Sequence, residues 1–119
     1  MLILIAGPYR SGTYDDPKLM QQNLDKLEAM ALPLFRLGHI PMIGEWVALP
    51  LLHLVGSTKP GDAAYKEILY PVAHRLLLKC DAVLRVDGIS KGADEDVRIA
   101  TERGLKIYYN LEDVPHAEQ

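Results

Sequence analysis

Four short apolar segments alternate with longer segments of helical periodicity, and this alternation restricts the possible folds more than any other feature of the chain. The first apolar segment, Leu2–Ala6, contains two isoleucines and no polar residue, as is typical of a strand that is buried on both faces. Further strands are predicted at residues 39–43, 82–86 and 106–109. The sequence therefore predicts the element order β-α-β-α-β-α-β.

The connections between these strands are long enough for parallel pairing through right-handed crossovers. The first and third strands are the most apolar, so we place them in the middle and expect the strand order 2-1-3-4. This predicts a three-layer, doubly wound α/β fold of the flavodoxin or Rossmann type, formed by a single domain of residues 1–119. In such a sheet a ligand crevice opens at the carboxyl ends of the first and third strands.

The spacing of the leucines predicts three long helices, at residues 17–37, 62–80 and 93–103. Proline has no backbone N–H, so we expect a kink or a tightened last turn at Pro33 in the first helix, and a kink near Pro71 in the second. Residues 45–55 are unusually apolar for a connection, and Pro50 is expected to prevent a long helix there.

Composition and charge exclude several classes of protein. The 119 residues carry a formal net charge of -3 and no dense cluster of Lys and Arg, which argues against binding to a nucleic-acid polymer. No segment approaches the ~20 apolar residues that a membrane-spanning helix needs, and the first strand is too short for a signal sequence. Cys80 is the only cysteine, so we expect a buried structural thiol, no internal disulfide and a cytoplasmic location.

The loop after the first strand carries an unusual set of side chains. Gly7 and Gly12 have the spacing of a phosphate-binding P-loop, but Thr13 and Tyr14 stand where that motif needs Lys and Ser or Thr. The neighbouring Tyr-Arg pair could stack on a base or sugar and hold a phosphate or carboxylate. The pattern fits equally well a tyrosine that caps the core beside an arginine that faces water.

A second loop, between residues 87 and 92, leads into the third predicted helix. Its helix N-terminus is suited to an anion or a polarised oxygen. Three acids follow, Asp94, Glu95 and Asp96, and acids in a first turn usually complement the helix dipole. Three carboxylates would also repel an anion, so we expect at least one to face a neutral group or a developing positive charge. A sugar ring that is losing its base has this character.

The segments GPYRSG, CDAVLRVDG, SKGADED and GLKIYY resemble the nucleoside 2-deoxyribosyltransferase-like superfamily. That superfamily includes the 2′-deoxynucleoside 5′-phosphate N-hydrolases and small bacterial and phage domains without an assigned function. The resemblance covers nearly the whole chain, except for residues 45–65, and agrees with the predicted sheet. It implies cleavage of the N-glycosidic bond of a nucleoside or nucleotide, and we expect no metal and no cofactor.

The resemblance also implies roles for particular residues. The nucleophile of the family lies four residues after the motif glycine, which is Asp96 when counted from Gly92, with Glu95 as the fallback. Tyr9 would orient the carboxylate or stack on the leaving base. The predicted catalytic residues are therefore Asp96, Glu95 and Tyr9. The predicted substrate-binding residues are Gly7, Tyr9, Arg10, Asp87, Ser90 and Gly92, and among these Arg10 and Ser90 would hold a 5′-phosphate.

Two departures from the family pattern affect this hypothesis. Asp96 replaces a glutamate and is one methylene shorter, and near-attack geometry tolerates little displacement. Ala73 stands where the family has a second acid. The role of this second acid would then have to be taken by Glu67, Asp87 or His74.

Two alternatives to an enzyme remain open from the sequence: a non-catalytic module that binds a nucleotide or sugar phosphate, and a structural or interaction domain. We also expect self-association. Residues 46–55, from Trp46 to Val55, crowd more apolar side chains than a peripheral connection readily buries, and such patches mark interfaces. The competing interpretation is a lid that folds over its own pocket.

Overall fold

The computed structural model describes residues 1–117, which form a four-stranded, all-parallel sheet with the strand order β2-β1-β3-β4. β1 (Leu2–Ala6) lies between β2 (Ile40–Ile43) and β3 (Ala82–Arg85), and β4 (Lys106–Tyr108) forms the outer edge beside β3. The predicted fold class and strand order are confirmed.

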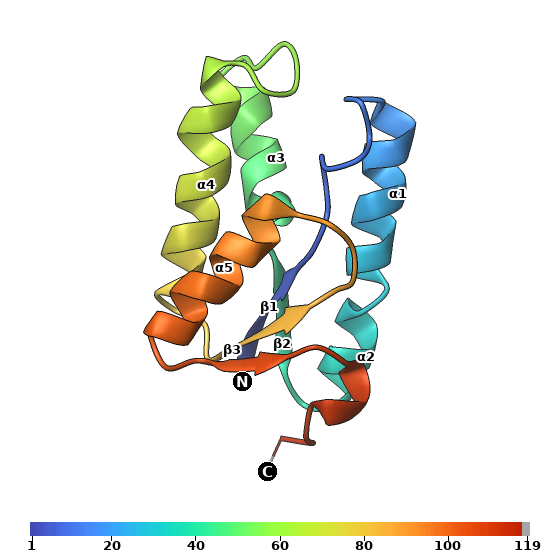
Figure 1. Ribbon diagram of the computed structural model, residues 1–119, viewed down its shortest axis with the longest axis vertical. Helices are drawn as coiled ribbons and strands as arrows, with labels where there is room; N and C mark the ends of the chain where they lie inside the picture. The colour runs from blue at the N-terminus through green and yellow to red at the C-terminus, as the bar shows by residue number, and fades with distance from the viewer. Residues whose placement is uncertain (118–119) are drawn as a thin grey trace.

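Helices cover both faces of the sheet, as Figure 1 shows. α1 (Pro17–Glu28) and α2 (Ala31–Arg36) pack on one face, while α4 (Ala63–Leu77) and α5 (Lys91–Glu102) pack on the other. α3 (Gly44–Leu54) follows β2 directly and runs beside α4. The molecule is therefore a three-layer α/β structure.

The side chains of β1 explain why this strand is apolar throughout. Ile3 and Ile5 pack into the cluster under α1 and α2, whereas Leu4 and Ala6 pack into the cluster under α4 and α5. All four are at most 4 % exposed. A central parallel strand buries both of its faces, so it has no position for a polar residue.

The predicted single helix over residues 17–37 is wrong, because the chain forms two helices there. The interruption falls at Ala29 and Met30, and Pro33 lies inside α2 rather than at a kink. The ring of a proline clashes with the carbonyl four residues before it, which for Pro33 belongs to Ala29. The first helix therefore ends there, and α2 restarts with Pro33 in its first turn, where no N–H is needed.

The prediction that Pro50 prevents a long helix is also wrong. α3 runs for 11 residues, with Pro50 on its exposed side. The helix loses the hydrogen bond that the N–H of this residue would have donated, but Ala48 and Leu52 are buried by the packing of α3. α4 likewise continues through Pro71. Burial of an apolar face thus overrides the local preference of both prolines.

The two ends of the described chain meet at the amino end of the sheet (Figure 1). The buried His39 ring links them: its Nδ1 lies 2.9 Å from the Met1 amino group and its Nε2 lies 2.7 Å from the Pro115 carbonyl oxygen. The carboxyl ends of the strands are free of this cluster. Within residues 1–117, no helix has the length and apolar character needed to cross a bilayer.

Candidate functional site

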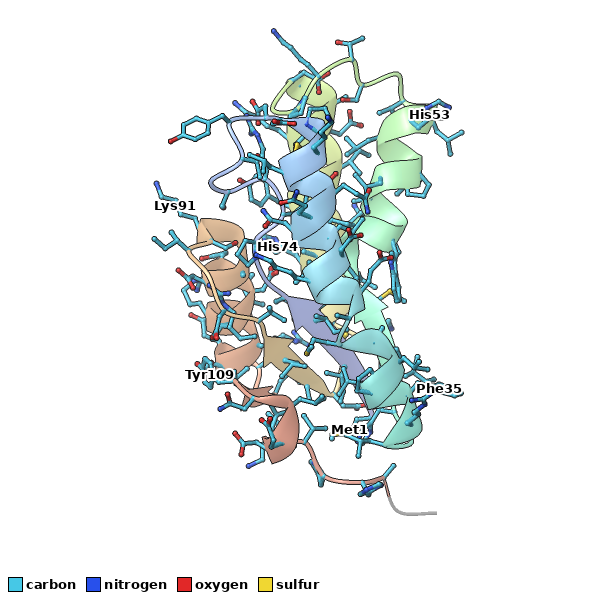
Figure 2. The ribbon with its side chains drawn as sticks, turned by 90° about the vertical axis from the view of Figure 1, so that its right-hand side faces the viewer. Met1, Phe35, His53, His74, Lys91 and Tyr109 are labelled. Atoms are coloured by element: carbon cyan, nitrogen blue, oxygen red, sulfur yellow. The ribbon has the colours of Figure 1, made fainter. Side chains whose placement is uncertain are left out.

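A cleft of about 700 Å³ opens at the carboxyl ends of the central strands. Five segments line it: the carboxyl end of β1, the loop that follows it, the first turn of α3, one face of α4 together with Gly61, and the first turns of α5. Figure 2 shows Lys91 at the start of α5 beside the loop after β1, and both belong to the cleft wall. The cleft lies where the doubly wound topology predicts a ligand site.

The three acids at the start of α5 point in three directions. Asp94 accepts a hydrogen bond from Arg85 Nη2 at 3.0 Å, and this pair ties the end of β3 to the helix. Glu95 forms an ion pair with Arg98 one turn further along the helix and does not line the cleft. Asp96 alone among the three lines the cleft. Successive residues of a helix are turned by about 100°, so each acid has its own environment.

The pKa of the Asp96 carboxyl is raised from 3.8 to about 7. Burial is the main cause, and the negative charges of Glu45 and Glu95 add to it, while the Arg85 guanidinium opposes the shift. Within residues 1–117, no group donates a hydrogen bond to this carboxyl, because the ordered donors at the start of α5 serve Asp94 and the helix cap. A partly buried acid without a donor retains its proton near neutral pH.

Glu45 is the site residue that sequence reasoning missed. It lies in the first turn of α3, directly after β2, and it lines the cleft opposite α5. Burial raises the pKa of its carboxyl, and a hydrogen bond from its own backbone N–H works against this shift. Ile43, the last residue of β2, pairs with Ile5 of β1, so the start of α3 lies beside the loop that follows β1. An acid that follows a strand at the ligand edge of the sheet was the available signal.

Two tyrosines stand next to Glu45. Burial and the Glu45 charge raise the pKa of Tyr9, which lines the cleft as expected. Tyr65, on α4, is only 6 % exposed, and within residues 1–117 its hydroxyl has no hydrogen-bond partner. Burial also raises the pKa of Tyr65, with further contributions from Tyr9 and Glu45. A buried hydroxyl without a partner is costly, and a ligand in the cleft could satisfy it.

Arg10 lies at the rim of the cleft, 5.7 Å from the centre of the Tyr65 ring. Its guanidinium is held by Asp15, with Nε donating to Oδ1 at 2.7 Å. This hydrogen bond is the main reason that the pKa of Asp15 is lowered. The loop is folded so that Tyr14 and Asp15 both have a positive φ, a conformation that costs free energy in residues other than glycine. Arg10 is thus a cation at the cleft that already has one carboxylate partner.

The Ser90 hydroxyl has a structural role in addition to its place in the cleft wall. It caps α5 by accepting a hydrogen bond from the Ala93 N–H at 3.1 Å. This cap starts α5 at Lys91, two residues earlier than predicted. Gly92 also lines the cleft. Gly7 lines it too, and a Cβ there would lie 2.7 Å from Leu27 Cδ2, so a larger residue would force the Leu27 side chain of α1 to move.

Asp87 does not lie in the cleft. It lines a smaller cavity of about 370 Å³ on the other side of the loop after β1, together with Lys26 and Gly88. Ala73 lines the main cleft, but neither Glu67 nor His74 does. The three residues considered as replacements for the missing acid are therefore outside the cleft wall, whereas Glu45 is part of it.

Within residues 1–117, no group of three or more His, Cys, Asp or Glu side chains is arranged to hold a metal ion. The cleft wall combines three carboxyl groups, one of which (Asp15) is paired with Arg10, with three phenols and a rim of cations. This combination suits a polar ligand whose body is uncharged and which carries one anionic group at its end. No family model, curated protein or solved structure matches this chain.

Proposed function

We propose that this protein cleaves the N-glycosidic bond of a nucleoside or nucleotide. The observation that carries the proposal is the pair of carboxyl groups, Asp96 from α5 and Glu45 from α3, in one partly buried cleft. Loss of a base from a pentose needs a carboxylate beside the developing positive charge of the sugar and a proton for the leaving base. Two carboxyl groups, one ionised and one protonated, would supply both. The resemblance to the 2-deoxyribosyltransferase-like superfamily supports the same reaction.

The rim of the cleft supports a phosphorylated substrate. Arg10, Lys66 and Lys91 all line it, and the Ser90–Gly92 turn brings the N-terminus of α5 to the same opening. Guanidinium, ammonium and helix N–H groups are the usual donors to a phosphate. A nucleoside monophosphate would place its phosphate at this rim and its sugar near the carboxyls.

Release of free base tests the proposal. Wild-type protein is incubated with a panel of ribo- and deoxyribonucleoside monophosphates and the matching nucleosides, and the free base is measured by chromatography. We expect base release from at least one monophosphate, and its loss in Asp96→Asn with ligand affinity within a few-fold of wild type, because a transition-state interaction has been removed. Asp96→Glu restores the reach of the family glutamate and shows whether the short side chain limits the rate.

A non-catalytic module that binds a nucleotide or sugar phosphate is the competing function. Thermal shift with the same panel separates the two, since a ligand that binds only the native state raises its stability. Stabilisation by a nucleotide, with no base released by wild type or by Asp96→Glu, would replace the enzyme with the binding module.

We further propose that the protein self-associates through α3. One side of this helix leaves five large apolar side chains partly or largely exposed: Trp46, Val47, Leu51, Leu54 and Val55. The other side buries Ala48 and Leu52. An apolar surface of this kind is typical of an interface, and a closed symmetric dimer is the commonest way to cover it.

A further inference from the structure

We propose that Glu45 is the carboxylate that attacks the sugar and that Asp96 is the acid that protonates the leaving base. This inference rests on the proposed N-glycosidase function. It reverses the assignment that the resemblance implies, in which the residue at the Asp96 position is the nucleophile. The geometry of the two helix starts carries it.

The backbone around Glu45 favours the ionised carboxylate. Glu45 lies in the first turn of an 11-residue helix, where the free N–H groups and the helix dipole stabilise negative charge. Its own N–H donates a hydrogen bond to the carboxylate. Two of the phenols in the cleft wall, those of Tyr9 and Tyr65, are close enough for the Glu45 charge to raise their pKa. The helix start and the hydrogen bond from its own N–H oppose the burial that raises the pKa of the Glu45 carboxyl, and so favour the carboxylate at this position.

The surroundings of Asp96 favour the protonated carboxyl. Asp96 lies beyond the first turn of α5, where Ser90 already accepts from the Ala93 N–H. The Arg85 guanidinium is the nearby cation, but its hydrogen bonds go to loop carbonyls and to Asp94. Of the two carboxyls, Asp96 is therefore the one that holds the proton. In glycosidases the partner that holds the proton is the general acid.

Side-chain length also supports Glu45 as the nucleophile and Asp96 as the acid. A nucleophile must reach the anomeric carbon, and Glu45 has the additional methylene that Asp96 lacks. An acid needs only hydrogen-bond reach to a nitrogen of the base. The Tyr65 hydroxyl has no hydrogen-bond partner within residues 1–117, and this residue is more than nine-tenths buried. This hydroxyl could donate a hydrogen bond to a sugar hydroxyl. This favours a sugar that lies on the Glu45 side of the cleft.

The reaction then proceeds in two balanced steps. A Glu45 carboxylate oxygen bonds to the anomeric carbon, the C–N bond breaks with its electron pair moving to the base nitrogen, and the Asp96 proton goes to the base. Water then bonds to the anomeric carbon and transfers a proton to the Asp96 carboxylate. The ester bond to Glu45 breaks, and its electron pair returns to the Glu45 carboxylate.

The test compares two leaving groups. Glu45→Gln and Asp96→Asn are assayed on a nucleotide that wild type cleaves and on an analogue with the same sugar phosphate and 4-nitrophenolate, which leaves without needing a proton. The comparison is made in kcat/KM, which reports the steps up to release of the leaving group and not the later hydrolysis of the ester, in which Asp96 acts as the base. We expect Asp96→Asn to lose about 10²–10⁴-fold in kcat/KM on the nucleotide but less than about 10-fold on the analogue. Glu45→Gln should lose at least about 10³-fold on both substrates. Glu67→Gln, an exposed carboxylate of α4 outside the cleft, is the matched control.

The assignment is overturned if the activity of Glu45→Gln recovers on the analogue while Asp96→Asn is inactive on both substrates. The proposal that the protein is an N-glycosidase would then still stand. Equal losses for Asp96→Asn on both substrates overturn it as well. Absence of base release by wild type overturns the proposed function itself. If Glu45→Gln melts at a much lower temperature than wild type, Glu45→Asp is assayed in its place. Its shorter carboxylate should slow the reaction of both substrates. Full activity of this variant on both would exclude Glu45 as the nucleophile.

Discussion

Arg10 and Asp15 form a two-pronged ion pair at the rim of the cleft, with Nε donating to Oδ1 at 2.7 Å and Nη2 donating to Oδ2 at 3.2 Å. Both side chains are close to half exposed. Surface pairs of this kind contribute little to stability, so the pair serves mainly to aim the guanidinium. A phosphate at the rim would share Arg10 with Asp15 or displace it.

Replacing Arg10 with alanine should weaken a nucleoside monophosphate about 10- to 100-fold and the matching nucleoside by less than about 3-fold, because a charge-assisted contact to phosphate is lost. Titration calorimetry with both ligands measures the difference. Lys18→Ala, an exposed cation outside the cleft, is the control. Equal losses for the two ligands would mean that Arg10 supports the loop and does not contact phosphate.

Asp96→Asn should stabilise the protein above pH 7. The folded-state pKa of about 7 lies above the ordinary 3.8, so the unfolded chain releases this proton first and the free energy of unfolding falls as pH rises from about 4 to about 7. Asparagine removes this dependence. The variant should gain roughly 1–3 kcal/mol at pH 8 and nothing near pH 4, as measured by urea unfolding.

The exposed Glu67→Gln should change stability by less than about 0.5 kcal/mol at either pH. A stability difference between Asp96→Asn and wild type that is the same at pH 4 and pH 8 would contradict a buried carboxyl at position 96.

Base release should follow a bell-shaped pH profile. With Glu45 as the anion and Asp96 as the acid, kcat/KM falls at low pH as Glu45 gains a proton and falls above about pH 7 as Asp96 loses one. Asp96→Asn acting on the 4-nitrophenolate analogue should lose the high-pH limb and keep the low-pH limb. A profile that keeps the high-pH limb in this variant would assign that limb to another group.

Leu54→Glu should abolish self-association. Leu54 is 77 % exposed at the end of α3, and a carboxylate there would be left unpaired in an apolar interface. Sedimentation at micromolar concentration should show a dimer for wild type and a monomer for the variant. Leu78→Glu places the same change at an exposed leucine after α4 and should leave the dimer intact. A monomeric wild type would refute the association.

Much of the fold could be predicted from the sequence, because it depends on local signals. Strands that are buried on both faces need continuous apolar runs, and crossover lengths determine parallel pairing. The starts of α1 and α4 are also local: the side chains of Asp16 and Asp62 each accept a hydrogen bond from an N–H in the first turn of the helix that follows. α3 was missed because its helix depends on tertiary packing that outweighs the effect of Pro50.

The candidate site was less predictable because its members come from separate elements. The one local signal for Glu45 was an acid that closely follows a predicted strand. Its place in the cleft depends on the start of α3 directly after β2 and on β2 lying beside β1. The three acids of α5 were recognised as a group, but their partners Arg85 and Arg98 are assigned only by three-dimensional contacts. The sequence therefore indicated where the cleft would form and the two loops that border it, but not the parts of the wall that α3 and α4 supply, which include Glu45.

The absence of any linker between β2 and α3 makes this junction intolerant of length changes. Ile43 is the last residue of the strand and Gly44 is the first of the helix, so an inserted residue would turn Glu45 by about 100° and carry it out of the cleft. The turn at residues 56–60 contributes no residue to the cleft wall, and its described side-chain contacts are hydrogen bonds to the Asp62 cap. Engineered insertions, affinity tags and circularly permuted ends should therefore be placed in that turn, and the strand-to-helix junction should be left as it is.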